Sequence, residues 1–204
     1  MEKLTSIVSV AAPLMRANID TDLIIPMQRY LMAERADMHR YAFEGLRFLS
    51  DGSDNPDFVL NKPPYKGTKI LISGQNFGCG SSRESAVWAL RGLGLRCIIA
   101  PSFGNIFYNN CFQNSLLPIV LAPEIVERLA KLAGGLGNRA PFDVDLEMQT
   151  VTVPDGETYF FDIEPQRRTQ LLEGLDDIGV TMTRAAEIAR HRQNDEKIRP
   201  WIYV

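Results

Sequence analysis

The residues best suited to chemistry gather in one short segment, Gly78-Cys79-Gly80-Ser81-Ser82-Arg83-Glu84. Glycines let a backbone approach a ligand closely, and the first N–H groups of a helix are unpaired donors that suit an anion. Two hydroxyls and a guanidinium follow the glycines, so the segment could hold a carboxylate and take part in proton transfer. The alternative is that Ser81 or Ser82 only caps a helix. The spacing alone leaves both interpretations open.

The segment does not match the common glycine-rich motifs. A Walker A loop requires a lysine before its serine or threonine, and the dinucleotide-binding pattern requires a glycine where Arg83 stands. The hydrolase pattern Gly-x-Ser-x-Gly fails because Glu84 stands two residues after Ser82. Nucleotide binding and triad hydrolysis are therefore not indicated.

Composition restricts the remaining function classes. The chain has 204 residues, 45% hydrophobic and 23% charged, which is typical of one soluble globular domain. Its 22 basic and 25 acidic residues give a net charge of −3, so no basic excess favours nucleic acid. No apolar run approaches the length needed to cross a membrane. We expect a cytoplasmic protein.

Metal ligands are scarce. The three cysteines, Cys79, Cys97 and Cys111, are widely spaced and form no Cys-x-x-Cys pair. The two histidines, His39 and His191, are expected at the surface. We therefore expect no metal site and no disulfide framework within this chain, and we interpret Cys79 as a small loop residue because no histidine or lysine is near it in sequence.

The surrounding elements predict how this segment is positioned. A strand over 69–73 precedes it, a helix over 81–93 follows, and a second strand spans 96–100. This βαβ unit implies two parallel strands with a right-handed crossover. Beyond it, the pattern predicts the following elements: a helix over 103–114, a strand over 117–121, a helix over 123–133, a β-hairpin over 142–163 and helices over 165–174 and 183–196. Residues 5–10 predict a first strand, and residues 28–48 are helical or irregular.

Several ordered motifs together resemble a known family. They are Asn76 to Glu84, Trp88-Ala89-Leu90, Ile99-Ala100-Pro101-Ser102-Phe103 and Asp20-Thr21-Asp22 with Leu-Ile-Ile-Pro26. The chain resembles the small subunits of 3-isopropylmalate dehydratase, which are stand-alone versions of the aconitase swivel domain. The resemblance runs from about residue 18 to residue 183 and also includes 55–61 and 142–146.

The resemblance implies an α/β fold of three layers, β/β/α, with a β-hairpin and C-terminal helices. We expect one swivel-type domain over 1–204, in which 1–66 holds the N-terminal strands and substrate loop, 67–133 the βαβ core, and 142–204 the hairpin and helical tail. Such a domain docks on a large subunit that carries a 4Fe-4S cluster, so the cofactor is expected on the partner and not here.

The resemblance also implies roles for particular residues. Ser81 matches the base that removes a proton from the substrate, and Ser82 and Arg83 match groups that hold a substrate carboxylate. Arg35 matches a substrate-contacting arginine, although Arg29 and Arg40 lie in the same stretch. The predicted backbone anion-binding loop consists of Gly78, Cys79 and Gly80. Asp20 and Asp22 could serve as acid–base groups, but we favour a turn that bonds its own backbone.

Serine is a weak base, which limits what this chain can do alone. A helix N-terminus contributes about 0.3–2 kcal/mol, or one to two pKa units, to stabilising an alkoxide. Further N–H donors, the charge of Arg83 and exclusion of water by the partner would have to add the rest. We therefore predict that the isolated chain is inactive.

The implied reaction is a hydro-lyase reaction, in which 2-isopropylmalate and 3-isopropylmalate interconvert through the dehydrated alkene in leucine biosynthesis. Two departures from the family pattern bear on the substrate, Ser85 in place of histidine and the run Glu34-Arg35-Ala36-Asp37. The alternatives are a related 2-hydroxy-dicarboxylate dehydratase of the methylmalate, dimethylmalate or homoaconitate type, and a non-catalytic anion-binding domain.

Overall fold

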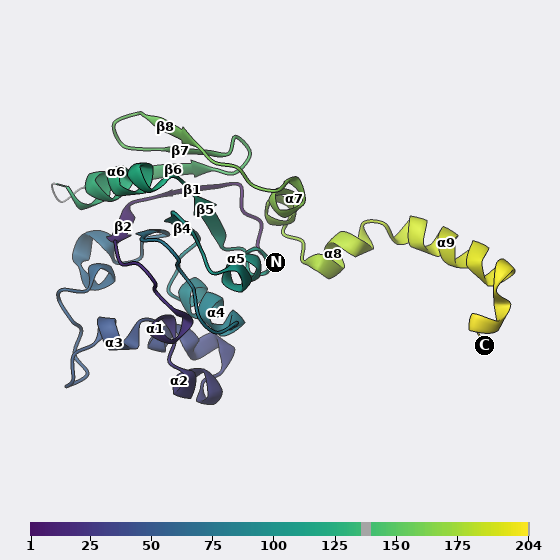
Figure 1. The fold of residues 1–204 in the computed structure, drawn as a ribbon, viewed down its shortest axis with the longest axis horizontal. Helices are drawn as coiled ribbons and strands as arrows, with labels where there is room; N and C mark the ends of the chain where they lie inside the picture. Colours follow the sequence, from purple (N-terminus) through teal and green to yellow (C-terminus); the bar gives the residue numbers. More distant parts are fainter. Residues whose placement is uncertain (136–139, 204) are drawn as a thin grey trace.

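Two four-stranded sheets pack face to face in the computed structural model, which describes residues 1–135 and 140–203 (Figure 1). The first sheet is parallel, with strands β2 (Ala11–Leu14), β3 (Ile70–Ser73), β4 (Cys97–Ala100) and β5 (Leu117–Val120) in that order. Ala11, Ile70, Cys97 and Leu117 form one row across it. β3 and β4 are buried throughout, as their continuous apolar sequences predict.

The second sheet is antiparallel and corrects two predictions. It consists of β1 (Ser6–Ser9), β6 (Phe142–Asp145), β7 (Thr150–Thr152) and β8 (Thr158–Phe160) in that order. The predicted hairpin over 142–163 is in fact three strands, because an additional turn that includes Gln149, with φ of +55°, separates β6 from β7. The single predicted N-terminal strand is likewise two short strands, one in each sheet.

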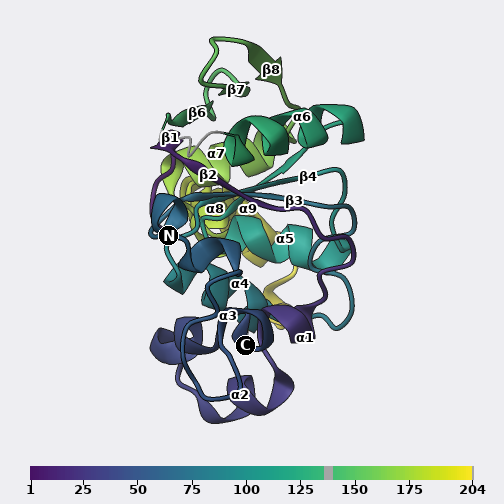
Figure 2. The same ribbon diagram turned by 90° about the vertical axis from the view of Figure 1, so that its left-hand side faces the viewer.

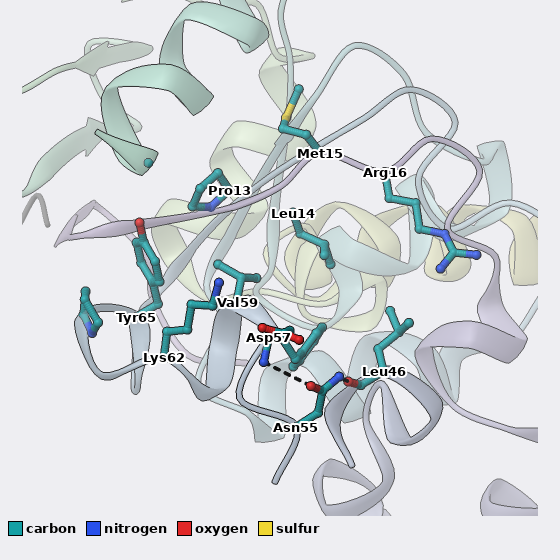
Figure 3. Close-up of a pocket in the computed structure, with 13 residues that line it drawn as sticks. Pro13, Leu14, Met15, Arg16, Leu46, Asn55, Asp57, Val59, Lys62 and Tyr65 are labelled. Carbon is teal, nitrogen blue, oxygen red and sulfur yellow. Dashed lines mark hydrogen bonds between the residues drawn. The ribbon is translucent and has the colours of Figure 1, made fainter. Parts of the chain in front are cut away.

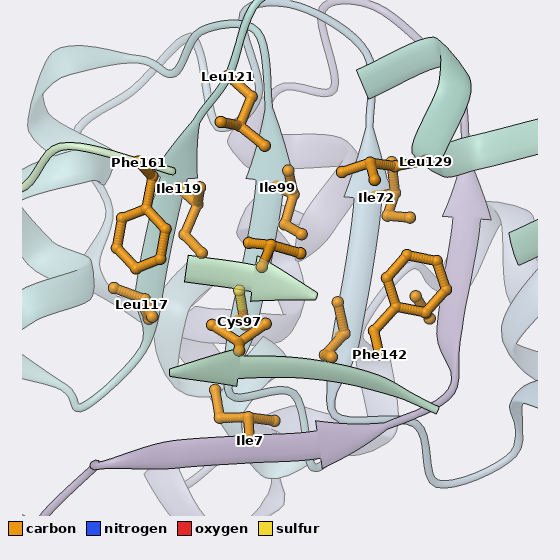
Figure 4. Close-up of a cluster of buried hydrophobic side chains, with 14 of the residues drawn as sticks. Ile7, Ile72, Cys97, Ile99, Leu117, Ile119, Leu121, Leu129, Phe142 and Phe161 are labelled. Carbon is orange, nitrogen blue, oxygen red and sulfur yellow. The ribbon is translucent and has the colours of Figure 1, made fainter. Parts of the chain in front are cut away.

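The space between the sheets is filled with aliphatic and aromatic side chains (Figure 4). Ile72, Ile99 and Ile119 project from the parallel sheet, and Phe142 projects from the antiparallel one. Helix α6 (Pro123–Gly134) lies on the same side and buries Val126, Leu129, Ala130 and Ala133 in this core. The proline at its first turn suits a helix start.

Helices cover the opposite face of the parallel sheet (Figure 2). The crossover helices α4 (Glu84–Gly92) and α5 (Asn105–Gln113) lie there. They are joined by short helices from the N-terminal third: α1 (Thr21–Ile24), α2 (Met27–Met32), α3 (Glu44–Arg47) and 3-10 turns over Arg35–Tyr41, Val59–Asn61 and Pro63–Tyr65. The predicted α/β fold with three β/β/α layers is confirmed.

The C-terminal helices are α7 (Pro165–Glu173), α8 (Asp177–Met182) and α9 (Ala185–Ile198), followed by a 3-10 turn over Pro200–Ile202. α7 packs on the body, whereas α8 and α9 extend away from it (Figure 1). α8 lies in a stretch for which the sequence predicted no element. Among the helices of the described residues, none has the length and apolarity that a membrane span requires.

Candidate active site

The predicted chemical segment lies where the carboxyl ends of the parallel strands meet. Residues 74–83, here called the site loop, leave β3 beside the chain that leaves β2. Gly78 N donates to Ile19 O at 2.7 Å, and Thr21 N donates to Cys79 O at 2.9 Å. The crevice outside the carboxyl ends of parallel strands is where open α/β sheets bind ligands.

The other side of the site loop is attached to the chain that leaves β4. Phe77 N donates to Ser102 O at 3.0 Å, and Gly104 N donates to Phe77 O at 2.8 Å. Phe77 is fully buried and packs edge-on against Phe107 of α5, with ring centroids 5.4 Å apart. The loop is therefore bonded through its backbone to both neighbouring segments.

Gly78 is required by two independent features of this arrangement. Its φ is +72°, a left-handed conformation that favours glycine. A Cβ placed on it would lie 2.2 Å from Cγ of Phe107. Gly80 also has a positive φ, of +89°, but the nearest atom to a Cβ there would be 3.5 Å away. Close packing therefore constrains the first glycine and conformation alone constrains the second.

The two serines lie ahead of α4, not in it. The predicted helix start at Ser81 is wrong by three residues, because α4 begins at Glu84 with Arg83 as its N-cap. Arg83 has extended dihedral angles, and no side chain caps the helix. Ser81 and Ser82 are exposed, and neither hydroxyl caps α4. The helix dipole consequently acts on Ser81 from a greater distance than the sequence implied.

Arg83 brings a positive charge beside Ser81. Its Nη2 donates to Ser81 Oγ at 3.3 Å, and Nη1 and Nη2 donate to the two carboxylate oxygens of Asp22 at 2.7 Å each. The guanidinium also lies over the ring of Tyr30, 5.7 Å from its centroid. These contacts occupy at most three of the five N–H donors of Arg83, so donors remain for a ligand carboxylate.

The Arg83–Asp22 pair favours the charged form of both partners. The hydrogen bonds from Arg83 lower the pKa of Asp22 from its ordinary value. The same bonds raise the pKa of Arg83. The Arg83 side chain is 11% exposed and that of Asp22 is 56% exposed, so the arginine is held in place from its solvent side.

The two aspartates of the Asp-Thr-Asp turn have different roles. Asp20 Oδ1 accepts from Leu23 N at 2.7 Å and caps α1, as expected for a turn that bonds its own backbone. Asp22 instead orients Arg83, 61 residues away in the sequence. Between them, Thr21 Oγ1 donates to the carbonyl of Ser81 at 3.0 Å and fixes the site loop.

Arg35 lies apart from Ser81 in this structure. It begins the 3-10 turn Arg35–Tyr41, where its Nη2 donates to Asn114 Oδ1 at 2.9 Å and its guanidinium lies over the Trp88 ring at 4.4 Å. It lines a cavity of about 590 Å³, and neither Ser81 nor Ser82 lines that cavity. Within the described residues, no hydrogen bond or ion pair joins Arg35 to the site loop.

The two other arginines of this stretch have acidic partners. Arg29 forms a two-pronged ion pair with Glu44, with its shortest contact at 2.6 Å, and Arg40 pairs with Asp37 at 3.1 Å. Arg35, by contrast, has an amide and an aromatic ring as its partners. Its charge therefore remains available to an anion, which favours Arg35 over the other two.

A second cavity shows that concavity alone does not locate the site. It has a volume of about 660 Å³ and lies between the end of β2 and the 3-10 turns near Tyr65 (Figure 3). Asn55 fixes its rim by donating to Leu46 O at 2.9 Å and accepting from Asp57 N at 3.0 Å. None of the predicted site residues lines this cavity.

Comparison of the sequence with known proteins shows which family the chain belongs to. Residues 1–124 match the Aconitase C-terminal domain family, and residues 128–165 match the family LeuD_N. Relatives from Roseobacter denitrificans and Agrobacterium fabrum, each named 3-isopropylmalate dehydratase small subunit, are 48% identical over 202 and 201 residues. These matches cover 99% and 98% of this chain and 100% of each relative. The chain belongs to this family of small subunits.

A solved structure supports the fold of this small-subunit family member. The crystal structure of 3-isopropylmalate dehydratase from Methanocaldococcus jannaschii superposes with a TM-score of 0.66 over 91% of this chain and 99% of that one. At 22% identity this likeness concerns the fold. The resemblance predicted from the sequence motifs is confirmed by the full-length relatives.

The three cysteines lie in different surroundings. Cys97 and Cys111 are buried in different parts of the core, and burial raises the pKa of both thiols far above the ordinary value. Cys79 is partly exposed in the site loop. Over residues 1–135 and 140–203, no group of three His, Cys, Asp or Glu side chains could hold a metal ion. The donor set described here does not fit an iron–sulfur cluster.

Sequence reasoning missed two residues of the site. Asp22 was interpreted as a turn residue although its carboxylate pairs with Arg83. Asn114, which contacts Arg35, was not considered at all. No local signal marks the pairing of Asp22, because Arg83 lies 61 residues away and is followed directly by another acidic residue, Glu84. The contact of Asn114 with Arg35 has no local signal either, because the two residues lie 79 positions apart.

Proposed function

We infer that this chain is the small subunit of a 3-isopropylmalate dehydratase. The enzyme is a hydro-lyase that interconverts 2-isopropylmalate and 3-isopropylmalate through the dehydrated alkene, a step of leucine biosynthesis. The observation that carries the inference is the site loop, in which an exposed serine hydroxyl lies 3.3 Å from a guanidinium oriented by an aspartate. The full-length relatives carry the substrate assignment.

We propose that Ser81 is the catalytic base. In the dehydration, its alkoxide takes the proton from the carbon next to the hydroxyl-bearing carbon. The electrons of that C–H bond form the alkene, and the hydroxyl leaves with the electrons of the C–O bond. In the hydration, the hydroxide adds to the carbon that lost its proton, and the Ser81 hydroxyl gives its proton to the carbon that lost the hydroxyl, which restores the alkoxide. A positioned base typically contributes about 10²–10⁴-fold to such a step.

Arg83 has two tasks in this proposal. Its charge beside Ser81 Oγ favours the alkoxide, because a nearby cation stabilises the ionised form of a hydroxyl. Its remaining N–H donors hold a substrate carboxylate together with Ser82. Of the predicted anion-binding loop, Gly78 N already donates to Ile19 O, so Cys79 and Gly80 would supply the backbone N–H groups. Asp22 keeps the guanidinium in the orientation that serves both tasks.

Arg35 is proposed to contact the substrate from the N-terminal segment. We define this segment as residues 27–47. Its side chains Met27, Leu31 and Met32 are exposed, and they belong to α2, next to Tyr30, which lies beneath Arg83. We propose that this segment faces the alkyl group of the substrate. An apolar pocket that differs by one methylene changes specificity by only about 1–3 kcal/mol, so this segment sets which 2-hydroxy dicarboxylate is preferred.

The partner and cofactor complete the proposal. We propose that the chain works in the cytoplasm on a large subunit whose 4Fe-4S cluster supplies Lewis-acid assistance to the leaving hydroxyl. In the complex, exclusion of water would strengthen the interaction between Arg83 and the Ser81 alkoxide. In the free chain, Ser81 and Ser82 are open to solvent. The isolated chain is therefore expected to be inactive.

The test is an anaerobic assay of this chain mixed with its iron–sulfur large subunit. Alkene formation is followed in the ultraviolet with 3-isopropylmalate, methylmalate and dimethylmalate, and loss of the alkene is followed with homoaconitate, which is already the dehydrated acid. Turnover that requires both chains and prefers isopropylmalate supports the proposal. Preference for another acid would contradict the leucine-pathway assignment. Turnover by the small subunit alone would contradict the partner requirement. If a demonstrated complex with an intact cluster turns over none of the four acids, the chain is better explained as an anion-binding domain.

A further inference from the structure

One side-chain amide connects three segments around the site. Asn114, at the end of α5, is 9% exposed. Its Oδ1 accepts from Arg35 Nη2 at 2.9 Å and from Trp88 Nε1 at 3.0 Å. Its Nδ2 donates to Glu84 Oε1 at 2.8 Å and to Asn110 O at 2.9 Å.

All the hydrogen-bonding capacity of this amide is used. A carboxamide has two acceptor positions on oxygen and two N–H donors on nitrogen, and Asn114 fills all four. The partners also determine which position the amide oxygen occupies and which the amide nitrogen occupies. A flipped amide would direct its N–H groups at the N–H donors of Arg35 and Trp88 and its oxygen at the carboxylate of Glu84. The orientation of the group is therefore unique.

On one side, the amide restrains Arg35. The arginine is exposed, and its described contacts outside its own segment are the bond to Asn114 and the stack on Trp88 at 4.4 Å. The indole is itself bonded to Asn114, so the surface on which Arg35 lies is held by the same amide. Loss of the amide would release both the guanidinium and its platform.

On the other side, the amide restrains the start of α4. Glu84 is the first residue of the helix and directly follows the site loop. No side chain caps this helix, so the bond from Asn114 is a side-chain tie on its first turn. Arg83 immediately precedes Glu84 in the chain, so its position depends on that turn. Asn114 thus sets the placement of Arg35 relative to Arg83.

We propose that Asn114 is a positioning residue of the dehydratase, which holds Arg35 at a fixed distance from the site loop so that both arginines meet one substrate. This inference rests on the proposed function. A purely structural role for a buried, fully bonded amide predicts something different, namely lower stability with unchanged kinetic constants.

The test is steady-state kinetics of the reconstituted two-subunit enzyme carrying Asn114→Asp. The new carboxylate keeps the acceptors for Arg35 and Trp88 but places an oxygen against both Glu84 and the carbonyl of Asn110. We expect KM for isopropylmalate to rise by about tenfold or more, the effect of losing a hydrogen bond to a charged group. Adding Glu84→Gln supplies an N–H donor to the new carboxylate and should recover part of the KM, since the Asn110 carbonyl still lacks its donor.

Asn109→Asp is the matched control, because the amide oxygen of Asn109 also accepts from an arginine, Arg167, at 2.8 Å, and neither residue belongs to the proposed site. It should leave KM unchanged. A lower melting temperature for Asn114→Asp with an unchanged KM would overturn the proposal, and so would a raised KM that Glu84→Gln does not recover.

A second pair of variants covers the case in which Asn114→Asp does not fold. Glu84→Ala should raise KM in the wild-type background and have no further effect after Arg35→Ala, because the two residues act through one amide. Additive effects would overturn the proposal. If the wild-type enzyme turns over none of the dicarboxylates, the proposed function fails first. If it turns over isopropylmalate and these variants leave KM unchanged, only the positioning role fails.

Discussion

The site loop and the N-terminal segment face the same chemistry but are held in different ways. The site loop is bonded through its backbone to the segments on both sides, at Ile19, Thr21, Ser102 and Gly104. The N-terminal segment has backbone bonds of this kind near its C-terminal end, where Phe43 N donates to Ile24 O and Arg47 O accepts from Asn55 N. Arg35, in contrast, is tied by one side-chain amide. The group assigned to bond breaking is thus fixed by main chain, and the group assigned to recognition is fixed by side chains.

The difference has a physical reason. A base must stay within a fraction of an ångström of its proton, and main-chain bonds to rigid strands keep that geometry. Recognition of an alkyl group tolerates looser contacts, and an exposed side chain held by other side chains accepts substitution without loss of the fold. Of the two departures from the resembled pattern, Glu34-Arg35-Ala36-Asp37 lies in the N-terminal segment, and Ser85 is buried in α4. The following variants test the contrast, from the largest expected effect to the smallest.

Gly78→Ala should disrupt the site loop most strongly. The added methyl would collide with the Phe107 ring and force a left-handed alanine. We expect a loss of about 3 kcal/mol in the free energy of unfolding, measured by urea denaturation. Gly80→Ala is the matched control, because Gly80 also has a positive φ but a Cβ there would meet no close neighbour. It should lower the free energy of unfolding by about 1–2 kcal/mol. Equal losses would mean that packing against Phe107 does not constrain the loop.

Arg83→Lys should separate charge from geometry. A lysine keeps the positive charge but cannot bridge Ser81 and both oxygens of Asp22. We expect kcat/KM of the reconstituted enzyme to fall by about 10–100-fold. Arg29→Lys, at an arginine paired with Glu44 within the N-terminal segment, is the comparison and should change kcat/KM by less than about threefold. If Arg83→Lys leaves kcat/KM unchanged, the proposed role of the planar guanidinium is contradicted.

Acid should weaken the site through Asp22. Its pKa is lowered in the folded chain, so its pairing with Arg83 adds stability above the unfolded-state pKa of about 4. That contribution is lost as the pH falls below about 4 and through the lowered value. In Asp22→Asn, the free energy of unfolding should therefore fall less between pH 5 and pH 3 than it does in the wild type. An acid limb identical to wild type would show that the pair does not form in solution.

Met32→Ser should have the smallest effect on stability. Met32 is 84% exposed on α2, so its loss exposes no core. We expect a change below about 0.5 kcal/mol in the free energy of unfolding. The ratio of kcat/KM for isopropylmalate to that for methylmalate should nevertheless shift if the segment faces the alkyl group. A marked loss of stability would show that the segment is as firmly packed as the site loop.

Most of the fold followed from local patterns. Continuous apolar runs identified β3 and β4, and the first-turn proline located α6. The errors occurred where local patterns are ambiguous. Ser81 and Ser82 are good capping residues, yet the chain still bends at Gly80 and Ser81, and the helix begins only at Glu84. The alternation over 142–163 could not show that Gln149 would adopt a left-handed turn.

The candidate site was only partly predictable. Ser81, Ser82 and Arg83 are consecutive, so the motif that identified the family also placed them together. The residues that orient them are distant in sequence, since Asp22 pairs with Arg83 across 61 positions and Asn114 meets Arg35 across 79. Such pairs depend on how the strands bring loops together, and one sequence carries no local trace of them.

The most direct test of the central claim is the turnover number of the reconstituted enzyme with Ser81→Ala. We predict a fall in kcat of about 10²–10⁴-fold, with complex formation intact and substrate binding largely kept. Ser82→Ala, the neighbouring serine, should mainly raise KM. Unchanged turnover with Ser81→Ala would contradict the assignment of this hydroxyl as the catalytic base.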